Sequence, residues 1–417
     1  MTHDERHAQS TSRLQDYEPI VGKGCIQELK MLAEALSGKV IQTINSTFIG
    51  GGVAEILEHM VPLLNQLGVD TRWDVIKGGQ EFFEVTKKFH NALHGKNTVT
   101  VSPQDFELFM EVSRKNLAEM RFFGDIFFIH DPQPAALIAK KKEIGKKWVW
   151  RCHIDLSDPD EQVWNFLRQF VADYDAAIFS APNFAQKLPI RQFMVTPSID
   201  PLSDKNRELE PDFVESVLRK YGVTSDKPMV VQISRFDRLK DPIGVIEAFE
   251  MVRKSVDCQL VLAGGTATDD PESEAVLEEV RKRAEGNPDI HILLIPPESD
   301  LEINALQRAA TVVVQKSLKE GFGLTISEAL WKGKPVVASA VGGIPLQIKD
   351  KFTGLLCYTV EGAAYAIKQL LTNPEYAAWL GKNGREYVRQ NFLITTQLKN
   401  YLLVFLALDR SEDVIYL

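Results

Sequence analysis

The chain has 417 residues, of which 44% are hydrophobic and 25% are charged, and it is too long for a single hydrophobic core. We therefore expect two domains of roughly 200 residues each. The formal net charge of -9 argues against broad binding to nucleic acids or anionic membranes, because both need a surface excess of lysine and arginine.

Signals for targeting, membrane insertion and disulfide formation are missing from the sequence. The opening stretch, MTHDERHAQSTSR, is polar and lacks the apolar region of a signal peptide. The most apolar late segment, residues 401–408, is shorter than the roughly 20 residues that a membrane helix requires. The cysteines show no C-x-x-C spacing: they are Cys25, Cys152, Cys258 and Cys357. We expect a cytoplasmic protein with reduced thiols and no membrane segment.

Short runs rich in β-branched and aromatic residues alternate with segments of helical period along the chain. The expected strands are residues 39–45, 125–131, 148–153, 176–180, 229–234, 258–265, 290–295, 311–315 and 335–339. After the first of these, the apolar positions of residues 53–67 form one stripe of an amphipathic helix. This alternation predicts an α/β fold with parallel sheets covered by helices on both faces.

A stretch rich in proline and charge, PSIDPLSDKNRELEP at residues 197–211, separates two strand–helix series and marks the expected linker. We place the first domain at residues 1–206 and the second at residues 207–391, and expect both to be doubly wound. In such sheets, ligands bind beyond the carboxyl ends of the strands. The loops that follow strands are therefore the expected location of a functional site.

The loop STFIGGGVAE follows the strand at residues 39–45. Its glycines, Gly50 to Gly52, permit a sharp turn and a close approach to a ligand, and the following helix start offers N–H groups to an anion. A flexible turn explains the same glycines equally well. The loop lacks the Gly-Lys-Ser/Thr of a P-loop, and Glu55 replaces the third glycine of a dinucleotide fingerprint, which disfavours a nicotinamide dehydrogenase.

Two further loops carry basic or titratable side chains just after a strand. In SRFDRLKD, Arg235 and Lys240 are spaced so that both could bind one anionic group, although solvated surface residues are the simpler alternative. In RCHIDLSDP, His153 and Asp155 close an aromatic strand. A histidine there could donate to a sugar hydroxyl or stabilise developing charge, and a structural role remains the alternative.

The segment EGFGLTISE, residues 320–328, follows the strand at residues 311–315. Thr325 and Glu328 fit a capping box, which explains Glu328 without any ligand. A capping box explains neither Glu320 nor the two glycines that flank Phe322. This turn would present N–H groups and a carboxylate at the end of the sheet, a combination suited to a polyhydroxylated, phosphorylated ligand.

Together, the Gly-Gly-Val-Ala loop, the arginine and lysine five residues apart, and the Glu-x7-Glu spacing resemble the retaining GT-B glycosyltransferases of family 4. Six longer segments are similar to the trehalose glycosyltransferring synthases: NSTFIGGGVAEIL, EFFEVTKKFHNALHGK, IHDPQPAALI, WRCHIDLSDP, PSIDPLS and KEGFGLTISEALWKGKPVV. Those enzymes join a nucleotide-diphosphate glucose to free glucose. The resemblance implies a GT-B fold, with two Rossmann-like domains that face each other across a cleft and a helix within residues 392–417 that packs back on the first domain.

The resemblance also implies roles for individual residues. Arg235 and Lys240 would bind the donor diphosphate, and Glu328 would accept hydrogen bonds from the ribose. Glu320 would face the transferring glucose, and His153 would hydrogen-bond to it. Further donor contacts would come from Gly51, Gly52, Phe322, Gly323 and Leu324. The acceptor pocket would be formed by Asp131, Gln133, His153 and Asp155.

The mechanism that the resemblance implies is front-face transfer with retained α configuration, in which the departing phosphate oxygen takes the acceptor proton. No metal is expected beyond a non-essential Mg²⁺, so the two cationic side chains and helix termini would neutralise the charge. The expected partners are small molecules, namely the nucleotide sugar, glucose and trehalose, and a second copy in a homodimer. Trehalose formation would be reversible.

Several alternatives stay open at the level of the sequence. A retaining trehalose phosphorylase shares the fold and the Glu-x7-Glu spacing but uses inorganic phosphate. A family 4 transferase could use another sugar acceptor, and a binding protein without catalysis would keep the same donor residues. The base of the donor, whether uracil, adenine or guanine, is not specified by any motif.

Overall fold

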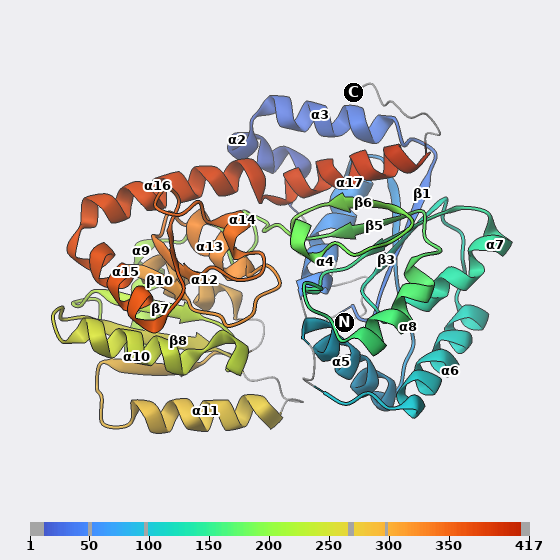
Figure 1. The fold of residues 1–417 in the computed structure, drawn as a ribbon. Helices are drawn as coiled ribbons and strands as arrows, with labels where there is room; N and C mark the ends of the chain where they lie inside the picture. Colours follow the sequence, from blue (N-terminus) through green and yellow to red (C-terminus); the bar gives the residue numbers. More distant parts are fainter. Residues whose placement is uncertain (1–11, 49–51, 96–98, 266–270, 297–298, 410–417) are drawn as a thin grey trace. The chain divides into compact units, whose positions relative to one another are not determined.

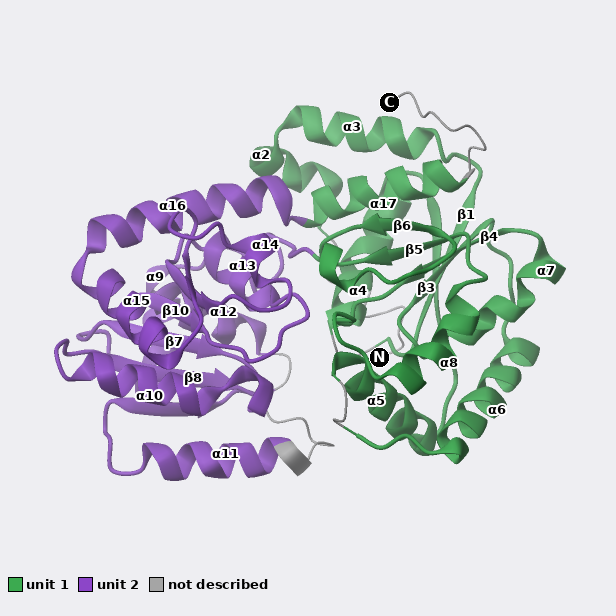
Figure 2. Cartoon of the chain, in the orientation of Figure 1, with its two compact units in different colours: residues 1–197, 394–417 green, residues 198–393 purple. Residues whose placement is uncertain are grey.

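The computed structural model describes residues 12–48, 52–95, 99–265, 271–296 and 299–409. The chain divides into two compact units: unit 1 comprises residues 1–197 and 394–417, and unit 2 comprises residues 198–393 (Figure 2). Unit 2 therefore begins at residue 198, before residue 206, where the sequence suggested that the first domain ends. The residues that follow position 198 belong to unit 2 because they contact it. The Asn304 amide donates to the backbone oxygens of Asp204 and Arg207, each at 2.8 Å.

Unit 1 is built on a six-stranded sheet with the order β2-β1-β3-β4-β5-β6. All neighbouring strands are parallel. The strands are β1 (Val40–Asn45), β2 (Asp70–Val75), β3 (Ile126–His130), β4 (Lys147–Arg151), β5 (Ala176–Phe179) and β6 (Arg191–Met194). The central strands β3, β4 and β5 are almost entirely buried, as expected for a parallel sheet covered on both faces.

The helices of unit 1 lie on both faces of this sheet, with α3 and α17 on one side and α6 and α8 on the other (Figure 1). They are η1 (Leu14–Tyr17), α2 (Glu18–Val21), α3 (Lys23–Glu34), α4 (Gly52–Gln66), α5 (Gln80–His94), α6 (Pro103–Glu119), η2 (Ala135–Lys140), α7 (Lys141–Ile144), α8 (Glu161–Val171), η3 (Pro182–Phe184) and α17 (Ile394–Asp409). Helix α17 contacts α3 and α4. Its Tyr401 and Phe405 rings pack edge-on against Phe128 of β3, at centroid distances of 5.0 and 5.3 Å.

Unit 2 contains a second parallel six-stranded sheet, with the order β12-β11-β10-β7-β8-β9. Its strands are β7 (Met229–Ile233), β8 (Gln259–Gly264), β9 (Ile290–Leu294), β10 (Val312–Gln315), β11 (Val336–Ser339) and β12 (Leu355–Cys357). Its helices are α9 (Pro211–Lys220), η4 (Arg238–Lys240), α10 (Pro242–Arg253), α11 (Pro271–Ala284), α12 (Asp300–Ala309), α13 (Leu324–Trp331), α14 (Ile344–Gln347), α15 (Val360–Thr372) and α16 (Pro374–Asn391).

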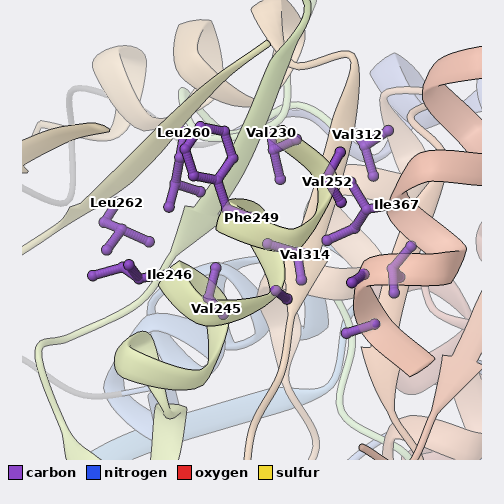
Figure 3. Close-up of a cluster of buried hydrophobic side chains, with 14 of the residues drawn as sticks. Val230, Val245, Ile246, Phe249, Val252, Leu260, Leu262, Val312, Val314 and Ile367 are labelled. Carbon is purple, nitrogen blue, oxygen red and sulfur yellow. The ribbon is translucent and has the colours of Figure 1, made fainter. Parts of the chain in front are cut away.

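The core of unit 2 forms where α10 and α15 cover one face of this sheet (Figure 3). Val245, Phe249 and Val252 recur at helical spacing along α10 and are fully or almost fully buried. The Phe249 ring lies near Leu260 of β8 in Figure 3. Burying an aromatic side chain of this size stabilises the folded state by about 1.5–3 kcal/mol. This core holds the strand ends that carry the candidate site.

The sequence-based expectation of two doubly wound α/β domains is confirmed, and all nine expected strands are present. The strands β2, β6 and β12 were not expected. Each lies at the edge of its sheet, where one side lacks a neighbouring strand and a continuous apolar run is not required. Arg72 and Asp74 in β2 and Arg191 in β6 interrupt the apolar pattern of those two strands. The third strand, β12, is apolar but has only three residues.

Each sheet reverses its strand order at one place, between β1 and β3 in unit 1 and between β7 and β10 in unit 2. Successive crossover helices lie on opposite faces on either side of such a point, and the loops after its two strands form the usual ligand crevice of doubly wound sheets. The loops after β1, β3, β7 and β10 are therefore the expected locations of ligand-binding residues. No helix within the described residues is long and apolar enough to cross a membrane.

Candidate active site

In unit 2, the order reversal brings the loop after β7 next to the loop after β10. Lys240 Nζ lies 2.6 Å from Glu320 Oε2, and Ser317 Oγ donates to the same carboxylate oxygen at 3.1 Å. The Lys240 and Glu320 side chains are only 20% and 9% exposed, so solvent screens this ion pair weakly. Two residues that the sequence selected from separate loops are therefore in direct contact.

The backbone around Lys240 is held by its own hydrogen bonds. Asp237 accepts the N–H of Leu239 at 2.7 Å and thereby caps η4. The Lys240 carbonyl accepts from Gln232 Nε2 at 2.8 Å, which ties the loop to β7. The next residue, Asp241, takes a left-handed φ of 49° and caps α10 through the N–H of Gly244 at 3.0 Å. These bonds fix the direction in which Lys240 leaves the loop.

Arg235, the second cation expected to bind a diphosphate, does not join this ion pair. Its side chain is 60% exposed, and its nearest carboxylate oxygen belongs to Asp237, at 3.5 Å from Nη2. Weak, exposed ion pairs of this kind contribute little to stability. The structure therefore brings Lys240 and Glu320 together but leaves Arg235 in the solvent-exposed part of the same loop.

The expected capping box at Thr325 and Glu328 is wrong. Helix α13 begins at Leu324, so Thr325 lies inside the first turn, and the capping position belongs to Gly323, which has no side chain to donate or accept. Gly323 has a φ of 85°, a left-handed conformation that glycine adopts without strain. The helix therefore starts earlier than the Thr-x-x-Glu pattern suggested.

A second loop, which the sequence reading missed, holds this turn in place. The Gly343 N–H donates to the Gly321 carbonyl at 3.1 Å. A Cβ on Gly342 would lie 1.6 Å from the Glu320 carbonyl oxygen, so a side chain cannot fit there. The Gln347 amide donates to the carbonyl of Phe322, whose buried ring packs against Phe392 at 5.6 Å. In the sequence, this loop could have been identified from the pair Gly342-Gly343, which follows the expected strand at residues 335–339.

Glu328 is buried in α13, and its Oε2 accepts from Gln307 Nε2 at 3.1 Å. One turn later, the buried Lys332 places Nζ 3.0 Å from Asn206 Oδ1 and 3.3 Å from the Glu328 carbonyl. Burial lowers the pKa of Lys332 to about 7, although the nearby Glu328 carboxylate favours the protonated form. Sequence reasoning missed Gln307, inside α12, and Lys332, the residue that follows α13, because neither belongs to a recognisable motif.

In unit 1, a hydrogen-bond chain crosses three neighbouring strands. Thr43 Oγ1 of β1 lies 2.9 Å from His130 Nε2 at the end of β3, and His130 Nδ1 lies 3.1 Å from His153 Nε2 just after β4. The two imidazole planes are 18° apart. Burial lowers the pKa of His130 to about 3 and that of His153 well below its usual value, and the nearby Arg151 charge adds to both effects.

Asp131 lies beside this chain and has a left-handed φ of 64°. Its Oδ1 accepts the backbone N–H of His153 at 2.8 Å, and its carbonyl accepts from Trp150 Nε1 at 2.9 Å. Burial raises the pKa of Asp131 to about 6, against the opposing effects of the His153 N–H and the Arg151 charge. Asp131 and His153, both expected in the acceptor pocket, are therefore joined directly.

The other expected acceptor residues occupy different positions. Asp155 is buried, and its Oδ1 accepts the N–H of Ser157 at 2.8 Å, which shapes the loop after β4. Gln133 follows β3, and among the described residues its buried Oε1 has no hydrogen-bond partner. Neither has a direct hydrogen bond to His153 within the described residues. A buried amide oxygen without a partner is uncommon in folded proteins, which distinguishes Gln133 from the hydrogen-bonded Asp155.

The glycine-rich loop after β1 is described only in part, because Gly50 and Gly51 lie outside the described residues. Gly52 is the first residue of α4 and is exposed. A Cβ at Gly52 would meet no described atom within 4 Å, so packing among the described residues does not require glycine there.

Sequence reasoning also missed three buried polar residues of unit 1: Thr43, His130 and Arg151. The Arg151 guanidinium is fully buried and donates through Nη2 to Ser180 Oγ at 3.0 Å. Among the described residues, its Nε and Nη1 atoms have no hydrogen-bond partner. The signal for His130 was its position at the end of an apolar strand, directly before Asp131.

Comparison with known proteins gives two matching family models: "Trehalose synthase, N-terminal domain" over residues 43–186 and "Glycosyl transferases group 1" over residues 214–387. The chain is 43% identical over 395 residues to the trehalose synthase of Thermococcus litoralis, which covers 94% of this chain and 96% of that protein. It is 31% identical over 402 residues to the trehalose phosphorylase of Grifola frondosa, covering 85% of this chain and 55% of that protein.

Among solved structures, the α,α-trehalose-phosphate synthase (UDP-forming) from Burkholderia xenovorans, in complex with glucose-6-phosphate, matches with a TM-score of 0.69 and 14% identity. The match covers 89% of this chain and 100% of that chain. At this level of identity, the comparison shows a common fold, and that fold is the GT-B fold.

Proposed function

We propose that this chain, which belongs to the trehalose synthase family of glycosyltransferases, transfers glucose from a nucleoside-diphosphate glucose to free glucose with retained configuration and so forms trehalose. The observation that carries this proposal is the Lys240–Glu320 ion pair where the strand order of unit 2 reverses. A cation and a carboxylate together suit a ligand that carries both phosphates and sugar hydroxyls.

In the proposed reaction, Lys240 and Arg235 bind the donor diphosphate and stabilise the negative charge that develops as it departs. Glu320 accepts hydrogen bonds from the hydroxyls of the transferring glucose. The Phe322-Gly323-Leu324 backbone precedes and starts α13, whose first N–H groups have no carbonyl partner within the helix and are suited to a phosphate. The exposed Arg235 side chain has the freedom to reorient onto the diphosphate.

Glu328 is proposed to recognise the ribose of the donor. A buried carboxylate accepts two hydroxyl hydrogens well, and the bond from Gln307 to Oε2 orients it. Since Glu328 does not cap α13, its ionised side chain is not required for the helix start. The capping box, which was the structural explanation for Glu328 from the sequence alone, therefore does not apply.

On the acceptor side, we propose that His153 donates a hydrogen bond to the donor glucose and that Asp131, Gln133 and Asp155 shape the acceptor pocket. Gly51 and Gly52 complete the donor contacts. The departing phosphate oxygen takes the proton of the attacking hydroxyl, so no side chain needs to act as a base. Charge neutralisation is assigned to the two cations and to helix termini, with Mg²⁺ at most a non-essential addition.

The family resemblance further supports the proposal that the protein is a cytoplasmic homodimer and that trehalose formation is reversible. Sedimentation of the purified protein tests the dimer. Incubation of trehalose with a nucleoside diphosphate tests the reverse reaction, because it must yield glucose and the nucleotide sugar.

A retaining trehalose phosphorylase is the second candidate, favoured by the 31% identity to a protein of that name. In that case, inorganic phosphate would occupy the position proposed here for the β-phosphate. A family 4 transferase with another sugar acceptor is the third candidate. The donor and the acceptor therefore have to be varied separately.

The decisive experiment supplies purified protein with glucose and, in separate reactions, UDP-glucose, ADP-glucose, GDP-glucose or glucose 1-phosphate. A chelator is present, and the sugars are analysed by NMR. An α,α-1,1-linked disaccharide from a nucleotide donor supports the proposal and identifies the base. Product from glucose 1-phosphate alone indicates a phosphorylase, and no product from any donor refutes free glucose as the acceptor. A Lys240→Ala variant serves as the low-activity control.

A further inference from the structure

A buried threonine hydroxyl stands at the inner end of the Thr43–His130–His153 hydrogen-bond chain. Thr43 and His130 are almost completely shielded from solvent, at 0% and 1% exposure. His153 is only partly buried and lies at the outer end. The chain therefore runs from the interior of the sheet to the site proposed for sugar binding.

We propose that the Thr43 hydroxyl, acting through His130, fixes His153 as the neutral tautomer with its proton on Nδ1, and so makes His153 a hydrogen-bond donor toward the sugar. This inference rests on the role in sugar binding proposed for His153. Thr43 and His130 are then positioning residues, because neither touches the substrate.

The direction of the first hydrogen bond follows from a count of donors and acceptors. Among the described residues, His130 Nε2 is the hydrogen-bond partner of the Thr43 hydroxyl. A buried hydroxyl that received a proton from His130 Nε2 would leave its own hydrogen without an acceptor, which is unfavourable away from water. The hydroxyl therefore donates, and His130 Nε2 accepts.

The rest of the chain follows from the neutral state of both rings. A neutral imidazole carries one N–H, so a His130 that accepts at Nε2 must carry its proton at Nδ1. That proton is donated across 3.1 Å to His153 Nε2. His153 then accepts at Nε2 and carries its own proton at Nδ1, an atom that makes no hydrogen bond within the described residues.

The surroundings keep both rings in the orientation that this assignment requires. The Phe128 ring lies 4.2 Å from the His130 ring, and the backbone N–H of His153 is held by Asp131. Burial and the Arg151 charge both disfavour protonation of either imidazole, so neither ring becomes a double donor near neutral pH. A single hydroxyl is enough to select one tautomer of the pair.

The test reads the tautomers directly by long-range ¹H–¹⁵N NMR of the full-length protein labelled with ¹⁵N-histidine. The His153 signals are assigned from a His153→Gln variant. We expect a protonated, pyrrole-type Nδ1 and an unprotonated Nε2 in His153 of the wild-type protein. The opposite pattern in wild-type protein would overturn the inference without further variants.

Variants of Thr43 test the cause of the tautomer. Thr43→Val removes the hydroxyl at nearly constant volume, and we expect the His153 signals to shift toward the Nε2-protonated form. Thr43→Ser, which restores a hydroxyl, should restore the wild-type pattern. Thr71→Val is the matched control, because it removes another buried hydroxyl of the same sheet, one that donates to the Val69 carbonyl at 3.0 Å. Unchanged His153 signals in Thr43→Val would exclude the proposed control by Thr43.

Kinetics provides a second readout once the donor is known. We expect Thr43→Val to lower kcat/KM for the donor by about tenfold, the effect of one lost hydrogen bond, while Thr71→Val retains wild-type kinetics. A failure of the proposed function would leave the NMR result intact. A failure of this inference would leave trehalose synthesis intact, so the two outcomes are distinguishable.

Discussion

The two units place their functional groups at equivalent points of similar sheets, yet they use different chemistry. In unit 2, the contact at the order reversal is an ion pair between Lys240 and Glu320. In unit 1, it is a chain of hydrogen bonds through two histidines whose charged forms are disfavoured by burial. The difference fits the function proposed above, in which unit 2 binds the charged diphosphate and unit 1 orients neutral sugars.

The largest expected effect comes from the cations of unit 2. Lys240→Ala and Arg235→Ala should each lower turnover roughly a hundredfold, because loss of one cation that stabilises the charge of the departing diphosphate costs about 3 kcal/mol of barrier. Steady-state kinetics with a saturating donor measures this effect. Lys382→Ala, which removes an exposed lysine of α16, is the control. Wild-type turnover in both Lys240→Ala and Arg235→Ala would refute the diphosphate assignment.

Rigidity of the charged site can be tested at Gly342. We expect Gly342→Ala to lower the free energy of unfolding by roughly 2–3 kcal/mol, because the new Cβ would collide with the Glu320 carbonyl and because φ is positive there. Urea denaturation measures the change. Gly24→Ala is the control, since a Cβ at that exposed position meets no described atom within 4 Å. If the two variants had the same free energy of unfolding, the turn at Gly342 would accommodate a side chain by shifting, and the expected rigidity would be refuted.

Acid should weaken unit 1 through His130. The pKa of His130 is about 3 in the folded protein and 6.5 in its unperturbed state. Between these pH values, the histidine is protonated in the unfolded chain and neutral in the folded one. Stability contributed by the neutral histidine is present above pH 6.5 and is lost as the pH falls toward 3. The loss reaches about 2 kcal/mol at pH 5.

Asp131 opposes this trend, because its pKa of about 6 lies above its usual 3.8 and its protonation favours the folded state between those values. Urea unfolding at pH 7 and pH 5 measures the balance, and His130→Gln should reduce the loss on acidification. If His130→Gln and the wild type lost equal stability, the buried histidine would not be the cause.

The smallest expected effect concerns Glu328. Glu328→Gln should weaken donor binding about tenfold, because a neutral amide replaces a charge-assisted acceptor for the ribose hydroxyls. Calorimetry with the preferred nucleoside diphosphate measures the affinity, and circular dichroism checks that α13 is retained. Glu361→Gln, at an exposed position in the first turn of α15, is the matched control. Unchanged affinity in Glu328→Gln would leave the carboxylate a structural role only.

Most strands that the sequence predicted are buried on both faces and therefore need continuous apolar runs, and the edge strand β9 was predicted because it too has such a run. It also predicted the loops after β7 and β10, since residues such as Lys240 and Glu320 follow those runs directly. The contact between these two side chains depends on strand order, which no local pattern contains. Edge strands such as β2 escaped prediction because their exposed residues interrupt the apolar run.

The wrong cap and the missed residues of the site have different causes. The cap at Thr325 failed because a left-handed glycine can start a helix without any side-chain partner. His130 and Lys332 were missed because each lies at an ordinary position at the end of a strand or helix. Their significance comes from burial and from partners distant in sequence, namely Thr43 and Asn206.

The position of α17 has a consequence for the order in which the protein is completed during synthesis. Unit 2 is one continuous stretch, residues 198–393, whereas unit 1 needs residues 394–409 to cover Phe128 with Tyr401 and Phe405. On the ribosome, the second domain therefore has its whole sequence before the first one does. Until α17 emerges, the nascent first domain therefore has part of its apolar sheet uncovered, and exposed apolar surface of this kind favours aggregation.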